Sequence, residues 1–144
     1  MILTFSEPKF EQQLRDGWKG TTFREDKNDR WKVGMKAHMW MHNPRNVRLN
    51  PHHIKDDIIY SIDYVVFIPV KGILKIYENE KRKKADIIFS EKRNLKRLNC
   101  IAKTDGFLDF KEMKQWFLKH GYTDPKGYKM KRLWFESYFD DLPF

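Results

Sequence analysis

One short segment of the 144-residue chain carries an unusual density of reactive side chains. The segment spans residues 17–34, and its polar residues include Lys19, Thr21, Thr22, Arg24, Glu25, Asp26, Asp29 and Arg30. Packing of a hydrophobic core does not account for so many charged and hydroxyl groups in one stretch, because such groups are seldom buried without partners. We therefore expect a functional site in this segment.

The spacing within the segment suggests what that site could do. Thr22 and Arg24 are two residues apart, so on a β-strand they face the same side. A threonine hydroxyl is a poor nucleophile until a base takes its proton, and a lysine whose pKa is lowered by burial, such as Lys19, can be that base. Arg24 can fork onto a phosphate or a carbonyl oxygen. The structural alternatives are an ordinary strand threonine, a solvated lysine, and an ion pair of Arg24 with Asp26 or another local carboxylate.

Metal and redox chemistry find little support in the sequence. The adjacent carboxylates of residues 25–29 are typical of a solvated turn, and the five histidines show neither HExxH nor paired Cys/His spacing. The single cysteine, Cys100, has no partner for a disulfide or a zinc site, and we expect it to be a small buried side chain. We predict no metal and no cofactor.

The positive charge is concentrated in the middle of the chain. The net charge is +9, and residues 71–103 carry 11 Lys and Arg against 4 Asp and Glu. Such an excess attracts polyanions, because each phosphate that it neutralises releases condensed counterions. Nucleic acid is the partner that this charge favours, and the alternative is a basic hairpin that only keeps the protein in solution.

The elements that must position the reactive segment follow from hydrophobic periodicity. We expect a strand over residues 2–5, then a helix capped by Ser6 that buries Phe10 and Leu14 and ends near Gly17. A strand over residues 21–23 and an exposed turn over 25–29 follow. The reactive segment thus begins at a helix exit and continues onto a strand.

The rest of the chain is dominated by strand signals. From Met35 to Met41 apolar residues alternate with polar ones, and Trp40 lies on the polar face, where it could stack on a base or simply pack. The turn over residues 43–46 contains Arg45 and opens a polar loop that holds His52 and His53. Further strands are expected over residues 58–68 (central or strongly bent), 73–77, 86–89 and 130–139, with residues 81–84 as a hairpin tip.

Helical signals are fewer. Asp109 with Glu112 three residues later resembles a capping box and predicts a helix closed by Gly121. Residues 91–103 fit a helix or a loop with a short strand, and we leave both open. Together these patterns predict a single α+β domain over residues 1–144, a small mixed β-barrel or strongly curved sheet with about two to three flanking helices. No apolar stretch approaches the roughly 18 residues of a membrane helix, so we expect a soluble, cytoplasmic protein without a membrane partner.

Two blocks of the sequence resemble a known family. The chain resembles the ASCH domain of the PUA-like superfamily in Lys19-Gly20-Thr21-Thr22-Phe23-Arg24-Glu25-Asp26 and in Arg30-Trp31-Lys32-Val33-Gly34-Met35. Much later, Asp105-Gly106-Phe107 ahead of a helix adds to this resemblance. The resemblance covers most of the chain. It implies a small β-barrel with flanking helices.

The resemblance also implies a function and a set of residues. The cleft between the first helix and the barrel would bind RNA, a nucleotide or a modified nucleoside. Some small members of the family are amidohydrolases that remove acyl groups from the exocyclic nitrogen of acylated cytidine, and their catalytic residues correspond to Lys19, Thr22 and Asp105. Asp105 departs from the family's Glu by one methylene, and the central basic hairpin lengthens this chain.

The sequence therefore yields two main hypotheses. The first is an RNA- or modified-nucleoside-binding domain whose protein partners are unknown, with ligand contacts from Lys19, Thr21, Thr22, Arg24, Arg30, Trp40 and Arg45 and phosphate contacts from Lys81, Arg82, Lys83 and Lys84. The second is an amidohydrolase of N4-acylated cytidine that acts through Lys19, Thr22 and Asp105. An RNA-cleaving domain has less support, because paired histidines or metal-binding carboxylates are not evident.

Overall fold

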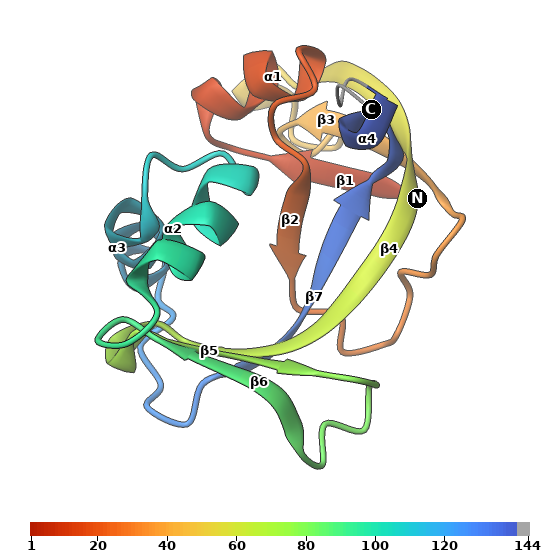
Figure 1. Cartoon of the computed structure of the whole chain (residues 1–144). Helices are drawn as coiled ribbons and strands as arrows, with labels where there is room; N and C mark the ends of the chain where they lie inside the picture. Colours follow the sequence, from red (N-terminus) through yellow and green to blue (C-terminus); the bar gives the residue numbers. More distant parts are fainter. Residues whose placement is uncertain (141–144) are drawn as a thin grey trace.

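One long strand, β4 (His52–Ile68), runs through the fold and organises it (Figure 1). The computed structural model describes residues 1–140. Strand β4 pairs with β3 (Lys36–Met41) through its first half, with β7 (Tyr128–Phe135) over residues 59–67 and with β5 (Ile73–Tyr77) at its end. The predicted central, bent strand is confirmed, but it begins six residues before the expected Ile58. His52 and His53, predicted to lie on a loop, are strand residues because they pair with Met41 and Trp40.

The remaining elements surround this strand. They are β1 (Ile2–Phe5), α1 (Pro8–Arg15), β2 (Thr21–Arg24), η1 (Val47–Leu49), η2 (Pro69–Lys71), β6 (Ala85–Ser90), α2 (Leu95–Thr104), α3 (Phe110–Lys119) and α4 (Glu136–Asp140). The predicted α+β class is confirmed, with seven strands and four α-helices among residues 1–140.

The strands form one mixed sheet. Its path runs β1-β3-β4-β5-β6, and β7 joins β4 to β2. β1 lies parallel to β3, whereas the other pairs are antiparallel. Within the described chain β1 and β2 each pair with a single strand, so the backbone ladder does not close into a ring. The predicted barrel is therefore unconfirmed.

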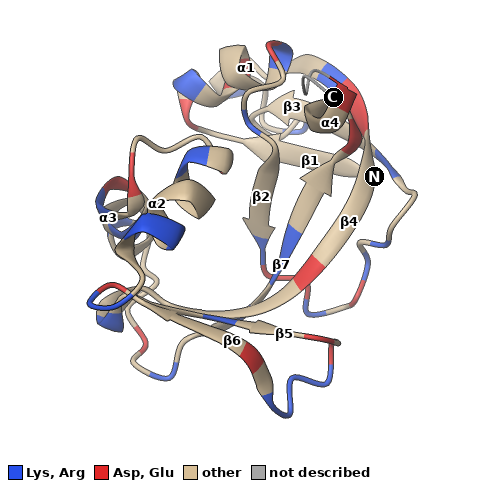
Figure 2. Ribbon diagram, in the orientation of Figure 1, with Lys and Arg blue, Asp and Glu red and all other residues tan. Residues whose placement is uncertain are grey.

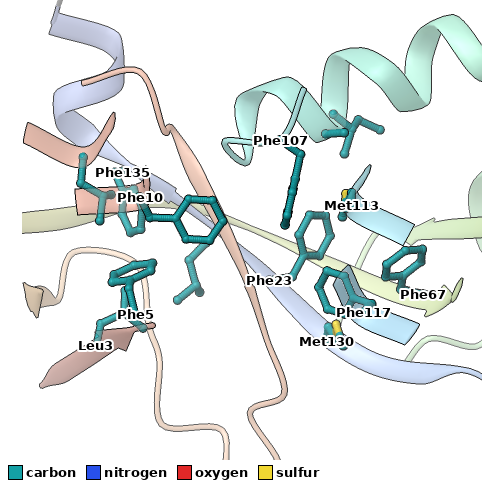
Figure 3. Close-up of a cluster of buried hydrophobic side chains, with 14 of the residues drawn as sticks. Leu3, Phe5, Phe10, Phe23, Phe67, Phe107, Met113, Phe117, Met130 and Phe135 are labelled. Atoms are coloured by element: carbon teal, nitrogen blue, oxygen red, sulfur yellow. The ribbon is translucent and has the colours of Figure 1, made fainter. Parts of the chain in front are cut away.

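Aromatic and aliphatic side chains fill the concave side of this sheet. The rings of Phe10 and Phe107 meet edge to face at 5.5 Å, and Phe67 contacts Phe117 in the same way at 5.0 Å (Figure 3). Phe23 of β2 lies within 6.4 Å of Phe117, so β2 is anchored to α3. Edge-to-face pairs of this kind add about 0.5–1.5 kcal/mol each beyond the burial of apolar area. The core thus fixes the segment that carries Thr22 and Arg24.

The helix predictions are largely confirmed. Phe10 and Leu14 are the buried residues of α1, and the Asp109 side chain caps α3 by accepting from the Glu112 N–H at 2.8 Å. The cap of α1 is Glu7 rather than Ser6, and Pro8 occupies the first turn. Residues 95–104 form α2, so most of the range left open over residues 91–103 is helical.

Two further expectations were wrong. The final strand ends at Phe135, and residues 136–140 form α4 in place of the predicted strand to Phe139. Tertiary contacts override the alternating pattern here, because the Ser137 N–H donates to Asp57 at 3.2 Å and Phe139 packs 4.6 Å from Tyr60. Cys100 was expected to be buried but lies exposed on α2, whose buried face is formed by its neighbours Ile101 and Ala102.

None of the helices described in residues 1–140 is long and apolar enough to cross a membrane. The cytoplasmic location stays a prediction.

Candidate functional site

A pocket of about 270 Å³ opens between the start of α1, the strands β1 and β2, and α3. Aromatic rings make up much of its wall: Phe5, Phe10, Phe23, Phe107, Trp116, Phe117 and Tyr122. Its polar lining includes Thr4, Ser6, Lys19, Thr22, Arg24, Glu25 and Asp105. The structure therefore brings together four residues that the sequence singled out, Lys19, Thr22, Arg24 and Asp105, although 81 positions separate Asp105 from Arg24.

Lys19 and Asp105 form a buried pair at the inner end of this pocket. The ammonium group donates to the main-chain carbonyl of Asp105 at 2.5 Å and lies 3.4 Å from Oδ1 of the same residue. Lys19 and Asp105 are 2% and 4% exposed. The ammonium also lies 4.2 Å from the centre of the Phe10 ring, close enough for a cation–π contact.

Local backbone geometry places both partners. Lys19 follows the end of α1, where Gly17 adopts a φ of +77° and the Lys19 N–H donates to the Gln13 carbonyl at 3.2 Å. Asp105 ends α2, and Gly106 after it has a φ of +94°, which L side chains seldom adopt. The two turns meet because the Gly20 N–H donates to the Thr104 carbonyl at 2.8 Å.

Burial controls the electrostatics of the pair. Loss of hydration lowers the pKa of Lys19 from 10.5 to about 8, and the nearby Asp105 carboxylate offsets part of this shift. Loss of hydration also raises the pKa of Asp105, against the opposing effect of Lys19. Thr21, which was expected to contact the ligand, instead donates its hydroxyl to Asp105 Oδ1 at 3.1 Å and is fully buried. Thr21 is thus a support for Asp105.

Thr22 and Arg24 lie side by side, as their spacing on a strand predicted. Arg24 Nε donates to the Thr22 hydroxyl at 3.1 Å, and Arg24 Nη2 donates to the Thr4 carbonyl of β1 at 2.8 Å. The guanidinium also lies 4.8 Å from the centre of the Phe5 ring. Burial lowers the pKa of Arg24 to about 10, which leaves it charged at neutral pH. Arg24 therefore spans the gap between β1 and β2, where the backbone ladder is interrupted.

The alternative in which Arg24 pairs with Asp26 is wrong. Asp26 accepts from Lys131 Nζ of β7 at 2.8 Å and from the N–H groups of Arg30 and Trp31 at 2.9 and 2.8 Å. Burial acts to raise the pKa of Asp26, but these hydrogen bonds outweigh it and lower the pKa. Lys131 also binds Asp29, whose pKa falls to about 2 because Lys131 and then Lys32 donate to it. The turn over residues 25–29 is thus pinned to the sheet rather than merely solvated.

Three further predicted ligand residues lie outside the pocket. Arg30 and Arg45 line a second, more open depression beside it. Trp40 lines neither space, is partly buried, and its ring contacts that of His53 at 5.7 Å. A ligand confined to the pocket would therefore not touch these three residues.

The hairpin tip between β5 and β6 carries the predicted basic run (Figure 2). Lys81, Lys83 and Lys84 are exposed, as a contact with phosphates requires. Arg82 does not fit that expectation, because its guanidinium donates to the carbonyls of Val65, Glu80 and Met130 at 3.2, 2.9 and 2.9 Å. The need to satisfy these carbonyls makes Arg82 a structural residue of the tip.

Sequence reasoning missed part of the surroundings. The aromatic wall formed by Phe5, Phe10, Trp116 and Tyr122 was not predicted, because periodicity marks a residue as buried without saying that it borders a cavity. The basic face of α2 was also missed, since residues 91–103 were left open. Its exposed cations are Lys96, Arg97 and Lys103 (Figure 2). The charge excess of residues 71–103 was the signal that could have identified it.

Within residues 1–140 no group of three or more His, Cys, Asp or Glu side chains is arranged to hold a metal ion. Comparison of the chain with protein-family models, curated proteins and solved structures finds no match. The resemblance to the ASCH domain therefore stays a prediction.

Proposed function

We propose that this protein binds RNA or a modified nucleoside, with one nucleobase in the pocket beside Lys19, Thr22 and Arg24. The observation that carries the proposal is the combination of aromatic walls with a few converging polar groups in about 270 Å³. Small-molecule sites are typically apolar pockets with few polar anchors, and this volume is close to the ~300 Å³ at the lower end of their range. A single planar base offers ring faces for stacking and a polar edge for hydrogen bonds.

The polar groups differ in how free they are to meet a ligand. Lys19 and Asp105 largely satisfy each other, whereas Thr22 and Arg24 have further capacity. Arg24 uses Nε and Nη2 within the protein, so Nη1 can donate to an acceptor on the base edge. The Thr22 hydroxyl accepts from Arg24 and retains its own proton for donation. Recognition would thus favour a base edge with acceptors next to each other.

Positive charge elsewhere on the surface supports a longer ligand than one nucleoside. The exposed lysines of the hairpin tip and the basic face of α2 provide positive charge for phosphates. We include in the proposal a PUA-like ASCH fold, in which β1 and β2 would complete the barrel. The bridge from Arg24 to the Thr4 carbonyl supports this, because it joins β1 and β2, which have no backbone ladder between them.

Binding of cytidine, N4-acetylcytidine and a short single-stranded RNA, followed by NMR and calorimetry, tests the proposal. Arg24→Gln should weaken binding of each ligand about tenfold, whereas Lys129→Gln, an exposed residue outside the pocket, should not. The Lys81/Lys83/Lys84→Ala variant should bind RNA less tightly with a shallower salt dependence and leave nucleoside binding unchanged. Absence of nucleoside and RNA binding, or equal loss in the Lys129 control, would refute the proposal.

A second function, amide hydrolysis, is favoured by one observation: burial lowers the pKa of Lys19 to about 8. In that reaction Lys19 takes the proton of the Thr22 hydroxyl, and Thr22 Oγ attacks the acyl carbon of N4-acylated cytidine. The C–N bond breaks as Lys19 gives that proton to the departing exocyclic nitrogen, and water then releases the acyl group from Thr22 as a carboxylate.

The geometry places this function second. Lys19 donates to Asp105, and Thr22 accepts from Arg24, with no hydrogen bond between Lys19 and Thr22 in the described chain. The test is release of acetate from N4-acetylcytidine between pH 6 and 10. Turnover should rise through a pKa near 8 and should be lost in Lys19→Met and Thr22→Val. No turnover, or turnover that survives in Lys19→Met, would exclude the mechanism.

A further inference from the structure

The second depression, of about 880 Å³, adjoins the aromatic pocket. Thr4 and Glu25 line both spaces, so the pocket and the depression adjoin at β1 and directly after β2. Three cations line the depression: Lys27, Arg30 and Arg45. A ligand that fills the pocket and extends past Thr4 and Glu25 would therefore enter a cationic surface.

These cations are free to bind an anion. All three are exposed, and none forms an ion pair within residues 1–140. Of the two carboxylates that line the depression, Asp26 is already neutralised by Lys131, with Oδ1 and Oδ2 both accepting hydrogen bonds. Three cationic side chains against the one remaining carboxylate, Glu25, leave an excess of two positive charges among the side chains of the depression.

The backbone that carries these cations is held in place. The Asp26 carboxylate accepts hydrogen bonds from the N–H groups of Arg30 and Trp31. Lys131 also donates to the Trp31 carbonyl at 3.0 Å. The Trp31 side chain is 7% exposed, which anchors the loop in the core. On the other side, the Arg45 N–H donates to the Asn43 side chain at 2.9 Å and fixes that turn. A preformed site spends less binding free energy on ordering its loops.

We propose that Lys27, Arg30 and Arg45 form a phosphate subsite, so that the ligand is a phosphorylated nucleoside, free or within RNA, rather than a free nucleoside. This inference rests on the proposed function, because it takes the adjoining pocket as the site of the base. The guanidinium group of an arginine can donate two parallel hydrogen bonds to phosphate oxygens. Two arginines from separate segments can therefore hold one phosphate from two sides. Asn28 and Asn43, which also line the depression, can donate to remaining oxygens.

The experiment compares cytidine, cytidine 5′-monophosphate and inorganic phosphate on the wild-type protein, on Arg30→Ala/Arg45→Ala and on Lys126→Ala/Lys129→Ala. The last variant loses the same charge from exposed lysines outside the depression. The monophosphate should bind the wild type about tenfold or more tightly than cytidine does. The arginine variant should lose this advantage and keep its affinity for cytidine, and the lysine control should keep both.

The outcomes separate the two proposals. If cytidine fails to bind but phosphate binds the wild type and not the arginine variant, the phosphate subsite is supported and the base-binding pocket is refuted. If cytidine binds and its monophosphate binds no better, or if the lysine control loses the advantage equally, the subsite is refuted while the base pocket stands. If none of the three ligands binds, both proposals fail.

Discussion

The buried Lys19–Asp105 pair should make the stability of the fold depend on pH in a defined direction. Lys19 has a pKa of about 8 in the folded protein and an ordinary value of 10.5 when exposed. Between these values the unfolded chain binds the proton and the folded chain has released it, so the free energy of unfolding rises with pH. The stability that Lys19 contributes is thus present above 10.5 and lost as the pH falls through about 8.

The magnitude follows from the shift. The two pKa values differ by about 2.5, and each pKa unit is worth 1.36 kcal/mol. The free energy of unfolding should therefore rise by about 3 kcal/mol between pH 7 and pH 10.5. The reference is Lys19→Met/Asp105→Asn, which removes both titrating groups and keeps an oxygen to accept from Thr21. Loss of the hydrogen bond to the Asp105 carbonyl lowers stability equally at every pH and does not affect the slope.

Urea unfolding of both proteins at pH 7, 8, 9 and 10 measures this effect. Other lysines and tyrosines titrate in both proteins, so the stability of the wild type minus that of the double variant isolates the pair. The difference should grow by about 2–3 kcal/mol as the pH rises, and NMR of the Lys19 side chain should show a midpoint near 8. Lys126→Met, at an exposed position, should give a flat difference. A flat difference for the pair, or a Lys19 midpoint near 10.5, would refute the reasoning.

Three further predictions concern residues that support the site. Lys131→Met should lower the free energy of unfolding by about 3 kcal/mol, because it leaves the buried Asp26 unpaired; a urea midpoint close to that of the wild type would contradict this. Arg82→Ala should cost about 1–3 kcal/mol and speed amide exchange in the β5–β6 hairpin, whereas Lys83→Ala should change neither; equal effects would show that Arg82 is not structural. Gly106→Ala should lower the free energy of unfolding by about 2 kcal/mol or more, since its φ is +94° and an added Cβ would press on Gln13 Oε1 and lie 3.0 Å from the buried Phe10 ring. Gly34→Ala, with open space around it, should cost less; thermal melts that rank the two in the opposite order would contradict this.

Local patterns predicted the elements well where a single periodicity dominates. The strand alternation from Met35 to Met41 and the apolar spacing of Phe10 and Leu14 each correspond to observed buried faces. The alternation beyond Phe135 failed, because side chains on Asp57 and Tyr60 bind α4 and their positions cannot be read from residues 136–140 alone. Where an element is decided by distant partners, its own sequence is a weak guide.

In the candidate site, too, contacts between residues close in the sequence were predictable and contacts between distant residues were not. The strand spacing alone placed Thr22 beside Arg24, but only a resemblance connected Asp105 to Lys19, 86 positions away. The partners of Arg82 and Asp26 were unpredictable for a similar reason. Arg82 binds carbonyl groups of β4 and β7, and Asp26 binds a lysine of β7, so each is satisfied by a strand that the sequence does not link to it. Charge density drew attention to both segments but did not distinguish free charges from paired ones.

The charge of Lys19 decides which of the two proposed functions the pocket can support at a given pH. With a pKa of about 8, roughly one molecule in ten has a neutral Lys19 at pH 7, and most carry an ammonium that donates to Asp105. A charged Lys19 helps to hold the pocket together but cannot accept the proton of Thr22. Base binding therefore needs no change from the observed arrangement, whereas hydrolysis needs a deprotonated Lys19 released from Asp105. The two functions should therefore differ in their pH dependence. The rate of hydrolysis should increase as the pH rises above about 8, whereas base binding should already have its full strength below that pH.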